Sequence, residues 1–291
     1  MQNFHQPLGM TRIVHTLAVL ALWHGCLAFI YVDPNPRPII YPPGYDRLAV
    51  EMAISRRSPD GPLVWTLSGL REGDIMDDYS NARNVIRDTN KLWINNTVPF
   101  AFAPGYTNEQ MVEIIKGMKL IMKGSCIKFR SVKIGVDKDF IYIQPLSGCW
   151  SLVGRQGTGA QTVSLMPPTN GSTCVYYGVA AHEFLHALGF EHMHDNFNRD
   201  DYVTVNFTNV QPKYYHDFDK ISKKDYTDFG VPYDYDSVMH YDRYAFSVDP
   251  DDATKTTIIP KDPNAVIGQN DHVSKRDFKK LNIRYNCTDF L

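Results

Sequence analysis

The spacing of apolar residues predicts regular elements in the chain ahead of residue 190 and few of them afterwards. Short apolar runs, bounded by polar and turn-forming residues, predict strands at 98–102, 127–132, 140–143 and 162–165. Between the first two runs, Thr107 and Gln110 form a capping-box pattern that starts a helix. The apolar positions of this helix recur at helical spacing and are expected in the core: Met111, Ile114, Ile115, Met118, Ile121 and Met122.

A second helix, more uniformly apolar, is predicted between Gly178 and Phe190. Beyond His192 the chain is polar and rich in tyrosine, with few periodic stretches, until Ser274 and Asp277 open a last helix. This order of elements predicts a two-lobed α+β domain with a cleft between the lobes. We expect a twisted mixed sheet and the long helices in the N-terminal lobe, and a mostly irregular C-terminal lobe.

The apolar helix carries the pattern H-E-x-x-H-x-x-G-x-x-H, from His182 to His192. Residues four apart lie on one face of a helix, so His182 and His186 present two imidazoles that one metal ion can bridge. Glu183 is rotated away from this row and can reach a water on the metal without becoming a ligand. Gly189 has no Cβ and can end the helix in a sharp turn that returns His192 as a third ligand. Three nitrogen ligands and an open position suit one catalytic zinc ion.

Two other interpretations fit this motif less well. A surface helix with scattered histidines does not explain the apolar neighbours Phe184, Leu185, Leu188 and Phe190, which place the helix in the core. A structural zinc site usually has four protein ligands, often thiolates, and no cysteine of the sequence lies at ligand spacing. The longer pattern, followed by a methionine turn, is the signature of metzincin proteases.

The segment Tyr233–Tyr241 reads Y-D-Y-D-S-V-M-H-Y, and with it the chain resembles the astacin family of secreted zinc endopeptidases. In that family a Ser-x-Met-His-Tyr turn passes beneath the metal. The resemblance implies that Met239 forms a hydrophobic floor under the histidines and that Tyr241 is a further, detachable zinc ligand. Five more stretches match the family, at 147–151, 159–165, 199–203, 267–269 and 285–287.

The chain departs from the family directly after His192. Most astacins have a glutamate there, which receives the new N-terminus when the pro-segment is cut away, whereas this chain has Met193. Methionine cannot pair with an ammonium group, which puts that activation contact in question. The family's following Ser-Arg pair is replaced by Asp195 and Asn196. These changes spare every predicted metal ligand and Glu183, so we expect the chemistry to survive.

The function implied by the resemblance is hydrolysis of internal peptide bonds in protein or peptide substrates. Glu183 would take a proton from the attacking water as general base and later protonate the leaving amine. Tyr241 would leave the metal and donate a hydrogen bond to the oxyanion. The substrate would lie extended along an edge strand at 149–153. Arg243 is a weak candidate for binding acidic substrate residues, against the simpler interpretation of a solvated arginine.

A rival from another class is a catalytically impaired relative that binds proteins or glycans without cutting them. Such a protein would usually have lost the general base or a ligand, whereas Glu183 and all three histidines are present. Met193 and Asn196 are the features that favour this rival.

The N-terminus predicts a signal peptide over residues 1–28. Arg12 precedes a mostly apolar run that starts at Ile13, and small residues stand before the expected cut. A membrane anchor is the alternative, but His24 and Gly25 interrupt the run and leave it short for a stable span. We therefore expect a secreted, extracellular protein without stable membrane association.

Residues 29–83 predict a pro-segment, because they begin with a proline-rich stretch and have little periodicity. Within them, E-G-D-I at 72–75 resembles the family's pro-segment motif, in which an aspartate occupies the zinc's open position. The resemblance implies that Asp74 is the zinc ligand of the latent form. The family usually has an aromatic residue two positions before the glycine, where this chain has Arg71.

The catalytic domain is expected to span residues 84–291. The stretch that begins with Asn84 resembles the start of mature astacins, and Arg83 before it suits cleavage by an activating trypsin-like protease.

The chain has five cysteines, of which Cys26 would leave with the signal peptide. The other four allow three connectivities, and arithmetic alone does not choose among them. The family resemblance implies the pairs Cys126–Cys287 and Cys149–Cys174. Oxidised cysteines fit the secretory route.

Composition and sequons bear on the partners and modifications that we expect. The net charge of −2 and the absence of a basic cluster in the sequence argue against nucleic-acid binding. We expect a monomer. Sequons make Asn95, Asn170 and Asn206 candidates for N-glycosylation. The sequon at Asn286 is a poor candidate, because Cys287 inside it is expected in a disulfide.

Overall fold

All four apolar runs form strands of one sheet, as expected. The computed structural model describes residues 18–23, 26–33, 68–76, 88–169, 172–224 and 226–291. The four strands are β4 (Thr97–Phe102), β5 (Lys128–Ser131), β6 (Phe140–Gln144) and β8 (Ala160–Leu165). The sheet also contains β3 (Ile75–Met76) and β7 (Cys149–Leu152), in the order β3-β7-β8-β6-β4-β5. The sheet is mixed, since β4 pairs in parallel with β5 and β6, β6 pairs in parallel with β8, and β7 runs antiparallel to β8.

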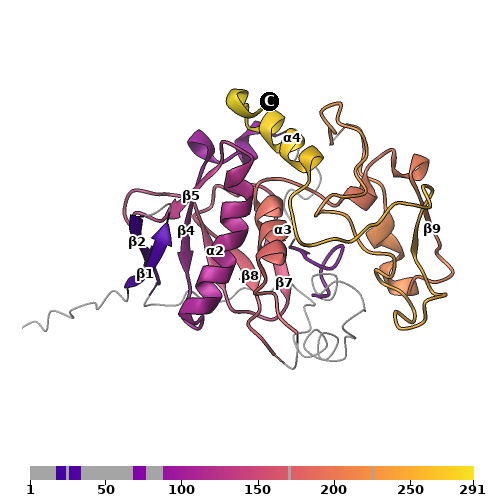
Figure 1. Ribbon diagram of the computed structural model, residues 1–291, viewed down its shortest axis with the longest axis horizontal. Helices are drawn as coiled ribbons and strands as arrows, with labels where there is room; N and C mark the ends of the chain where they lie inside the picture. Colours follow the sequence, from indigo (N-terminus) through magenta and orange to yellow (C-terminus); the bar gives the residue numbers. More distant parts are fainter. Residues whose placement is uncertain (1–17, 24–25, 34–67, 77–87, 170–171, 225) are drawn as a thin grey trace, which may run out of the picture.

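Two helices lie side by side against this sheet (Figure 1). Helix α2 (Asn108–Lys123) begins at the expected capping box, in which the Thr107 hydroxyl and the Gln110 side chain each accept from the other residue's backbone N–H. Helix α3 (Tyr177–Ala187) carries the histidine motif. The helices approach closely at Gly117, where a Cβ atom would lie 2.6 Å from a carbonyl oxygen of α3. This contact buries α3 on its α2 side.

The chain after His192 forms the second lobe, drawn mainly in orange in Figure 1, and returns at its yellow C-terminal helix to the first lobe. Its regular elements are the antiparallel strands β9 (Val203–Val205) and β10 (Ile258–Pro260) and helix α4 (Lys275–Arg284). Helix α4 begins at the second expected capping box, formed by Ser274 and Asp277. Short 3-10 helices of the two lobes cover Thr89–Lys91, Ile94–Asn96, Met193–Asp195, Arg199–Asp201, Pro212–Phe218 and Thr288–Phe290. The two-lobed α+β prediction is confirmed.

Two disulfides crosslink the chain, one within the first lobe and one between that lobe and the C-terminal segment. Cys126–Cys287 joins the chain after α2 to the chain after α4, and Cys149–Cys174 joins β7 to the loop before α3. This is the pairing that the family resemblance implied. The first of them closes a loop with a sequence separation of 161, and such a crosslink stabilises mainly by restricting the unfolded chain.

An N-terminal hairpin pairs β1 (Ala18–Trp23) with β2 (Cys26–Tyr31), and β2 lies near β4. The hairpin overlaps the predicted signal peptide, residues 1–28, whose removal stays a prediction. Over the described residues, no helix combines the length and the apolar content that crossing a bilayer requires.

Candidate metal centre and active site

Helix α3 and the turn after it bring the three histidines of the motif together. His182 and His186 lie one helical turn apart, with ring centroids separated by 4.7 Å. Gly189 ends the helix with a φ of 97°, a conformation that a side chain would strain. A Cβ on Gly189 would also lie 2.3 Å from the Arg284 guanidinium. The positive φ therefore favours glycine at this turn, which returns His192 to the other two imidazoles.

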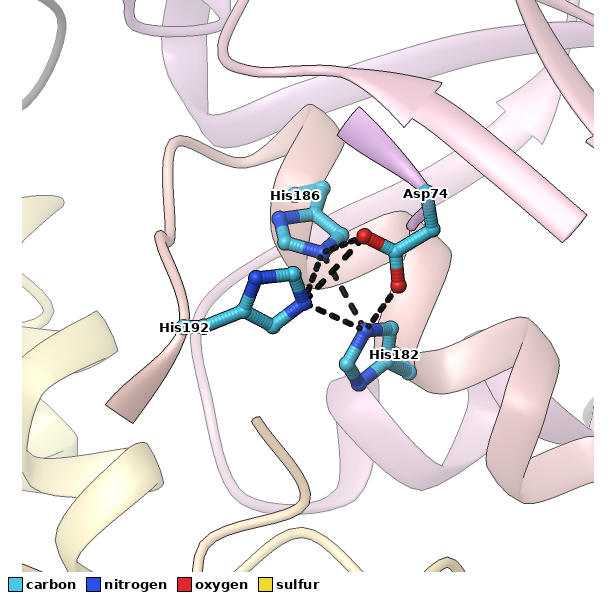
Figure 2. A group of neighbouring side chains, drawn as sticks. All are labelled: Asp74, His182, His186 and His192. Atoms are coloured by element: carbon cyan, nitrogen blue, oxygen red, sulfur yellow. Dashed lines mark hydrogen bonds and ion pairs between the residues drawn. The ribbon is translucent and has the colours of Figure 1, made fainter. Parts of the chain in front are cut away.

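The Nε2 atoms of the three histidines converge on one point (Figure 2). They are 3.1 Å apart for His182 and His186, 3.2 Å for His186 and His192, and 3.3 Å for His182 and His192. Three nitrogens at zinc-ligand distance in a tetrahedron would be separated by about 3.3 Å. The spacing of the imidazoles is therefore that of a ligand set around a single zinc ion.

Each imidazole is held by a hydrogen bond at its other nitrogen. Nδ1 lies 2.8 Å from the Val238 carbonyl oxygen in His182, from the Phe190 carbonyl oxygen in His186, and from Glu72 Oε2 in His192. With Nδ1 as the donor, the Nε2 lone pair of each ring is directed at the shared point. Burial lowers the pKa of His182 to about 4, which favours the neutral ligand form.

Asp74 supplies a fully buried carboxylate at the same point. Its Oδ2 is 3.1 Å from His182 Nε2, and its Oδ1 is 3.2 Å from His192 Nε2 and 3.7 Å from His186 Nε2. Burial lowers the pKa of His192, but the charges of Asp74 and Glu72 outweigh it and raise that pKa to about 9. The two carboxylates thus favour a positive charge among the imidazoles. Three converging nitrogens with a carboxylate fit a zinc ion.

Glu183 lies beside the centre with its carboxylate fully buried. Neither of its oxygens has a hydrogen-bond partner among the described residues. Burial, and then the charge of Asp74, raise the pKa of Glu183 well above its usual value. A buried carboxylate that is unsatisfied in a polar centre is a candidate for proton transfer.

The methionine turn adjoins the centre and contains Met239 and Tyr241, both buried. Met193 N donates to the Met239 carbonyl oxygen at 2.9 Å, which ties the turn to the chain after the third histidine. The Tyr241 ring lies 4.4 Å from the His192 ring, and its hydroxyl has no hydrogen-bond partner within the described ranges. Burial, followed by the charge of Asp74, raises the pKa of Tyr241 well above its usual value, so the phenol keeps its proton.

The edge strand that we expect to bind substrate, β7, is covered by residues of the predicted pro-segment. Strand β3 pairs with β7 in parallel, and Ser151 N donates to the Asp74 carbonyl oxygen at 3.0 Å. On the other side of the segment, Glu72 N donates to Asp217 Oδ1 at 2.9 Å. Residues 68–76, purple in Figure 1, therefore contact both lobes and lie between them.

Sequence reasoning missed the roles of four charged residues near the centre. Glu72 stands in the pro-segment motif, yet only the structure reveals its hydrogen bond to His192. Arg71 forms ion pairs with Glu72 and, at 3.3 Å, with Glu191. Glu191 precedes a metal-ligand candidate by one residue, and this position could have indicated that it lies near the centre. Lys280 donates to Met193 Sδ at 3.0 Å, and the sequence does not indicate this contact because Lys280 lies far from the motif.

The remaining predicted positions lie away from the centre or outside the described residues. Arg83, Asn84 and Asn170 fall outside them. Asn95 is exposed and Asn206 is partly exposed. Arg243 donates to the Ala265 carbonyl oxygen at 3.0 Å.

Fold and site together define a metallopeptidase of the metzincin type. The peptidase family model described as Astacin matches residues 85–286, and the chain belongs to this family.

Among curated proteins, the chain is 38% identical over 233 residues to zinc metalloproteinase nas-14 of Caenorhabditis elegans, which covers 77% of this chain and 44% of the relative. It is 36% identical over 247 residues to meprin A subunit alpha of Rattus norvegicus, which covers 84% of this chain and 31% of the relative. The chain thus spans less than half the length of these two relatives. Among solved structures it is similar to high choriolytic enzyme 1, a hatching-enzyme zinc protease of Oryzias latipes. That match has a TM-score of 0.60 and 31% identity, and covers 73% of this chain and 98% of the other.

Proposed function

We propose that this chain is the latent form of a secreted zinc endopeptidase that hydrolyses internal peptide bonds of proteins. The observation that carries the proposal is the buried set of three converging Nε2 atoms with the unsatisfied Glu183 carboxylate beside it. His182, His186 and His192 would hold the metal. Zinc, when bound there, would polarise the scissile carbonyl and lower the pKa of a water molecule to about 7.

The protein's own residues divide the proton transfers between them. Glu183 accepts a proton from the attacking water and delivers it to the leaving amine, and burial of its carboxyl group supports this acid–base role. Tyr241 retains its phenolic proton and donates it in a hydrogen bond to the oxyanion. Met239 supports the imidazoles from below. A peptide substrate binds along the β7 edge after β3 has left it.

The pro-segment, residues 29–83, keeps the enzyme inactive. Asp74 occupies the point at which water and substrate must bind, and β3 occupies the β7 edge. Cleavage after Arg83 by a trypsin-like protease releases the catalytic domain, 84–291, as a monomer without affinity for nucleic acid. The signal peptide, residues 1–28, directs it to the extracellular space, where two disulfides persist.

Activation and chelation test this proposal. The purified full-length chain is treated with trypsin, the new N-terminus is sequenced, and cleavage of a protein substrate is followed with and without a zinc chelator. We expect cutting before Asn84, one zinc per chain and activity that chelation abolishes. Asp74→Ala should raise the activity of the uncut chain, since its carboxylate no longer competes for the centre. Chelation-insensitive cleavage, or a processed chain without stoichiometric metal, would refute the proposal.

A further inference from the structure

Arg71 of the pro-segment forms an ion pair with Glu191 of the catalytic domain. Arg71 Nη2 lies 3.3 Å from Glu191 Oε2, and the two side chains are 27% and 10% exposed. Glu191 immediately precedes His192, so this ion pair lies at the border of the metal centre. Over the described part of the chain, no other cation lies within ion-pair distance of Glu191.

A tight turn fixes the position of the Arg71 side chain. Gly73 N donates to the Leu70 carbonyl oxygen at 2.9 Å, and Ile75 N donates to the Arg71 carbonyl oxygen at 3.0 Å. Positive φ angles at Glu72 (50°) and Gly73 (86°) allow the chain to reverse there. The same short segment thus places Asp74 on the histidines, β3 on the β7 edge and Arg71 on Glu191. Two of these three contacts are at positions that a bound substrate must take.

Removal of the pro-segment takes Arg71 away and leaves Glu191 behind. A largely buried carboxylate that loses its cation keeps a desolvation penalty, which a new cation can relieve. Asp217, which accepts from Glu72 N, also loses that hydrogen bond, but His216 Nε2 stays 3.3 Å from the same oxygen. The Arg199 guanidinium does not fill the gap, because it contacts Asp195 and Asp200. Glu191 is therefore the carboxylate that loses its ion-pair partner when the segment leaves.

We propose that Glu191 determines specificity, and that the activated enzyme prefers substrates whose arginine or lysine side chain takes the position of Arg71. This inference rests on the proposed function, since it names the substrate class of the same site. Arginine is expected to bind better than lysine, because its planar guanidinium can meet a carboxylate with two parallel hydrogen bonds.

The test compares peptide cleavage by the trypsin-activated wild type and its variants. A peptide library analysed by mass spectrometry identifies the position at which arginine is enriched. Matched peptides then carry arginine, lysine or glutamine at that position. We expect kcat/KM to be about 10-fold higher for arginine than for glutamine, a modest ratio for a pair that remains partly exposed. In Glu191→Gln this ratio should approach one, and Glu191→Lys should favour glutamate. Glu109→Gln, which removes an exposed carboxylate on α2, serves as the control and should keep the wild-type ratio.

A second measurement does not depend on any variant folding. A peptide copying residues 68–76 should inhibit the wild-type enzyme about 10-fold better than the same peptide with Arg71→Gln. If the wild type cuts both matched peptides equally and the two inhibitors are equally potent, the inference is overturned and the proposed function stands. If no peptide is cut by activated, zinc-loaded protein, the proposed function itself fails.

Discussion

The two lobes bury different kinds of side chain. In the sheet-and-helix lobe the buried residues are mainly apolar, such as Ile114, Ile121 and Phe129, and the backbone hydrogen bonds lie within helices and strands. In the lobe after His192, many buried residues are polar or charged: His194, Asp195, Asn196, Asp217, Asp234, Ser237, His240, Ser274, Asp277 and Lys280. One lobe is therefore stabilised mostly by a hydrophobic core, and the other depends on specific polar contacts.

The centre is assembled from both lobes at their boundary. Helix α3 supplies His182, His186 and Glu183 from the apolar lobe, where close packing fixes the direction of each side chain. The polar lobe supplies Tyr241 and the carbonyl oxygen that orients His182. An apolar core provides rigidity, whereas a polar network provides hydrogen bonds whose loss is costly when one partner is removed. The predictions below separate the two contributions.

The largest effect is expected from Glu183, the proposed general base of the apolar lobe. Glu183→Ala removes the proposed general base but no metal ligand, so zinc content should stay at one per chain while kcat falls by about 1000-fold or more. Metal analysis and peptide hydrolysis by the activated protein measure the two quantities. The control is Glu109→Ala, a change of an exposed carboxylate on α2 that should leave both unchanged. Activity near that of the wild type in Glu183→Ala would show that another group takes the proton.

A smaller loss is expected from the polar lobe's hydroxyl. Tyr241→Phe keeps the buried ring against His192 and removes only the proposed oxyanion donor, so kcat should fall by about 100-fold. Zinc content and KM should change little, because the missing hydrogen bond forms in the transition state. Tyr244→Phe, three residues further along the chain, is the matched control. If Tyr241→Phe retains full turnover, the polar lobe contributes support rather than chemistry.

Two substitutions of buried residues, one in each lobe, separate the effect on stability from the effect on zinc binding. Asp277 accepts from Ser237 Oγ at 2.6 Å and from Val238 N at 3.0 Å, and the Val238 carbonyl oxygen orients His182. Asp277→Asn leaves one of these donors without an acceptor, so it should lower the free energy of unfolding by about 1–3 kcal/mol. Because the support of a ligand is disturbed, zinc affinity should also fall about 10-fold.

Ile121→Ala is the apolar counterpart. It should cost about 2–5 kcal/mol of stability by opening a cavity under α2, yet leave zinc affinity unchanged. Urea unfolding and competition with a metal chelator provide both values for each variant. The comparison fails if Ile121→Ala weakens zinc binding as much as Asp277→Asn does.

The same contrast explains what the sequence predicts and what it does not. The periodicity of apolar residues predicts β4, α2 and α3, because residues buried in an apolar core recur at the spacing of the strand or helix that carries them. The histidine motif also predicts the centre from local spacing, since its residues are close in sequence and lie on one helix and the turn that follows it. The contacts of Lys280 with Met193 and of Arg71 with Glu191 join segments that are distant in sequence through single side chains. No local sequence pattern predicts such contacts.

The smallest effect concerns the new N-terminus. Lys280 Nζ is buried and donates to Met193 Sδ at 3.0 Å, so the residue in place of the family's glutamate already faces an ammonium group. A second ammonium within 4 Å of the first would be repelled by about 4 kcal/mol at an effective dielectric constant of 20. We therefore expect the mature N-terminus not to dock there. Mature chains that begin one or two residues before or after Asn84 should then differ less than about twofold in kcat/KM, the range of a surface change. Engineered cleavage sites and steady-state kinetics provide the comparison, with the N-termini verified by mass spectrometry. A tenfold loss on adding a single residue would mean that the N-terminus docks after all, and that the polar lobe rearranges around Lys280 to accept it.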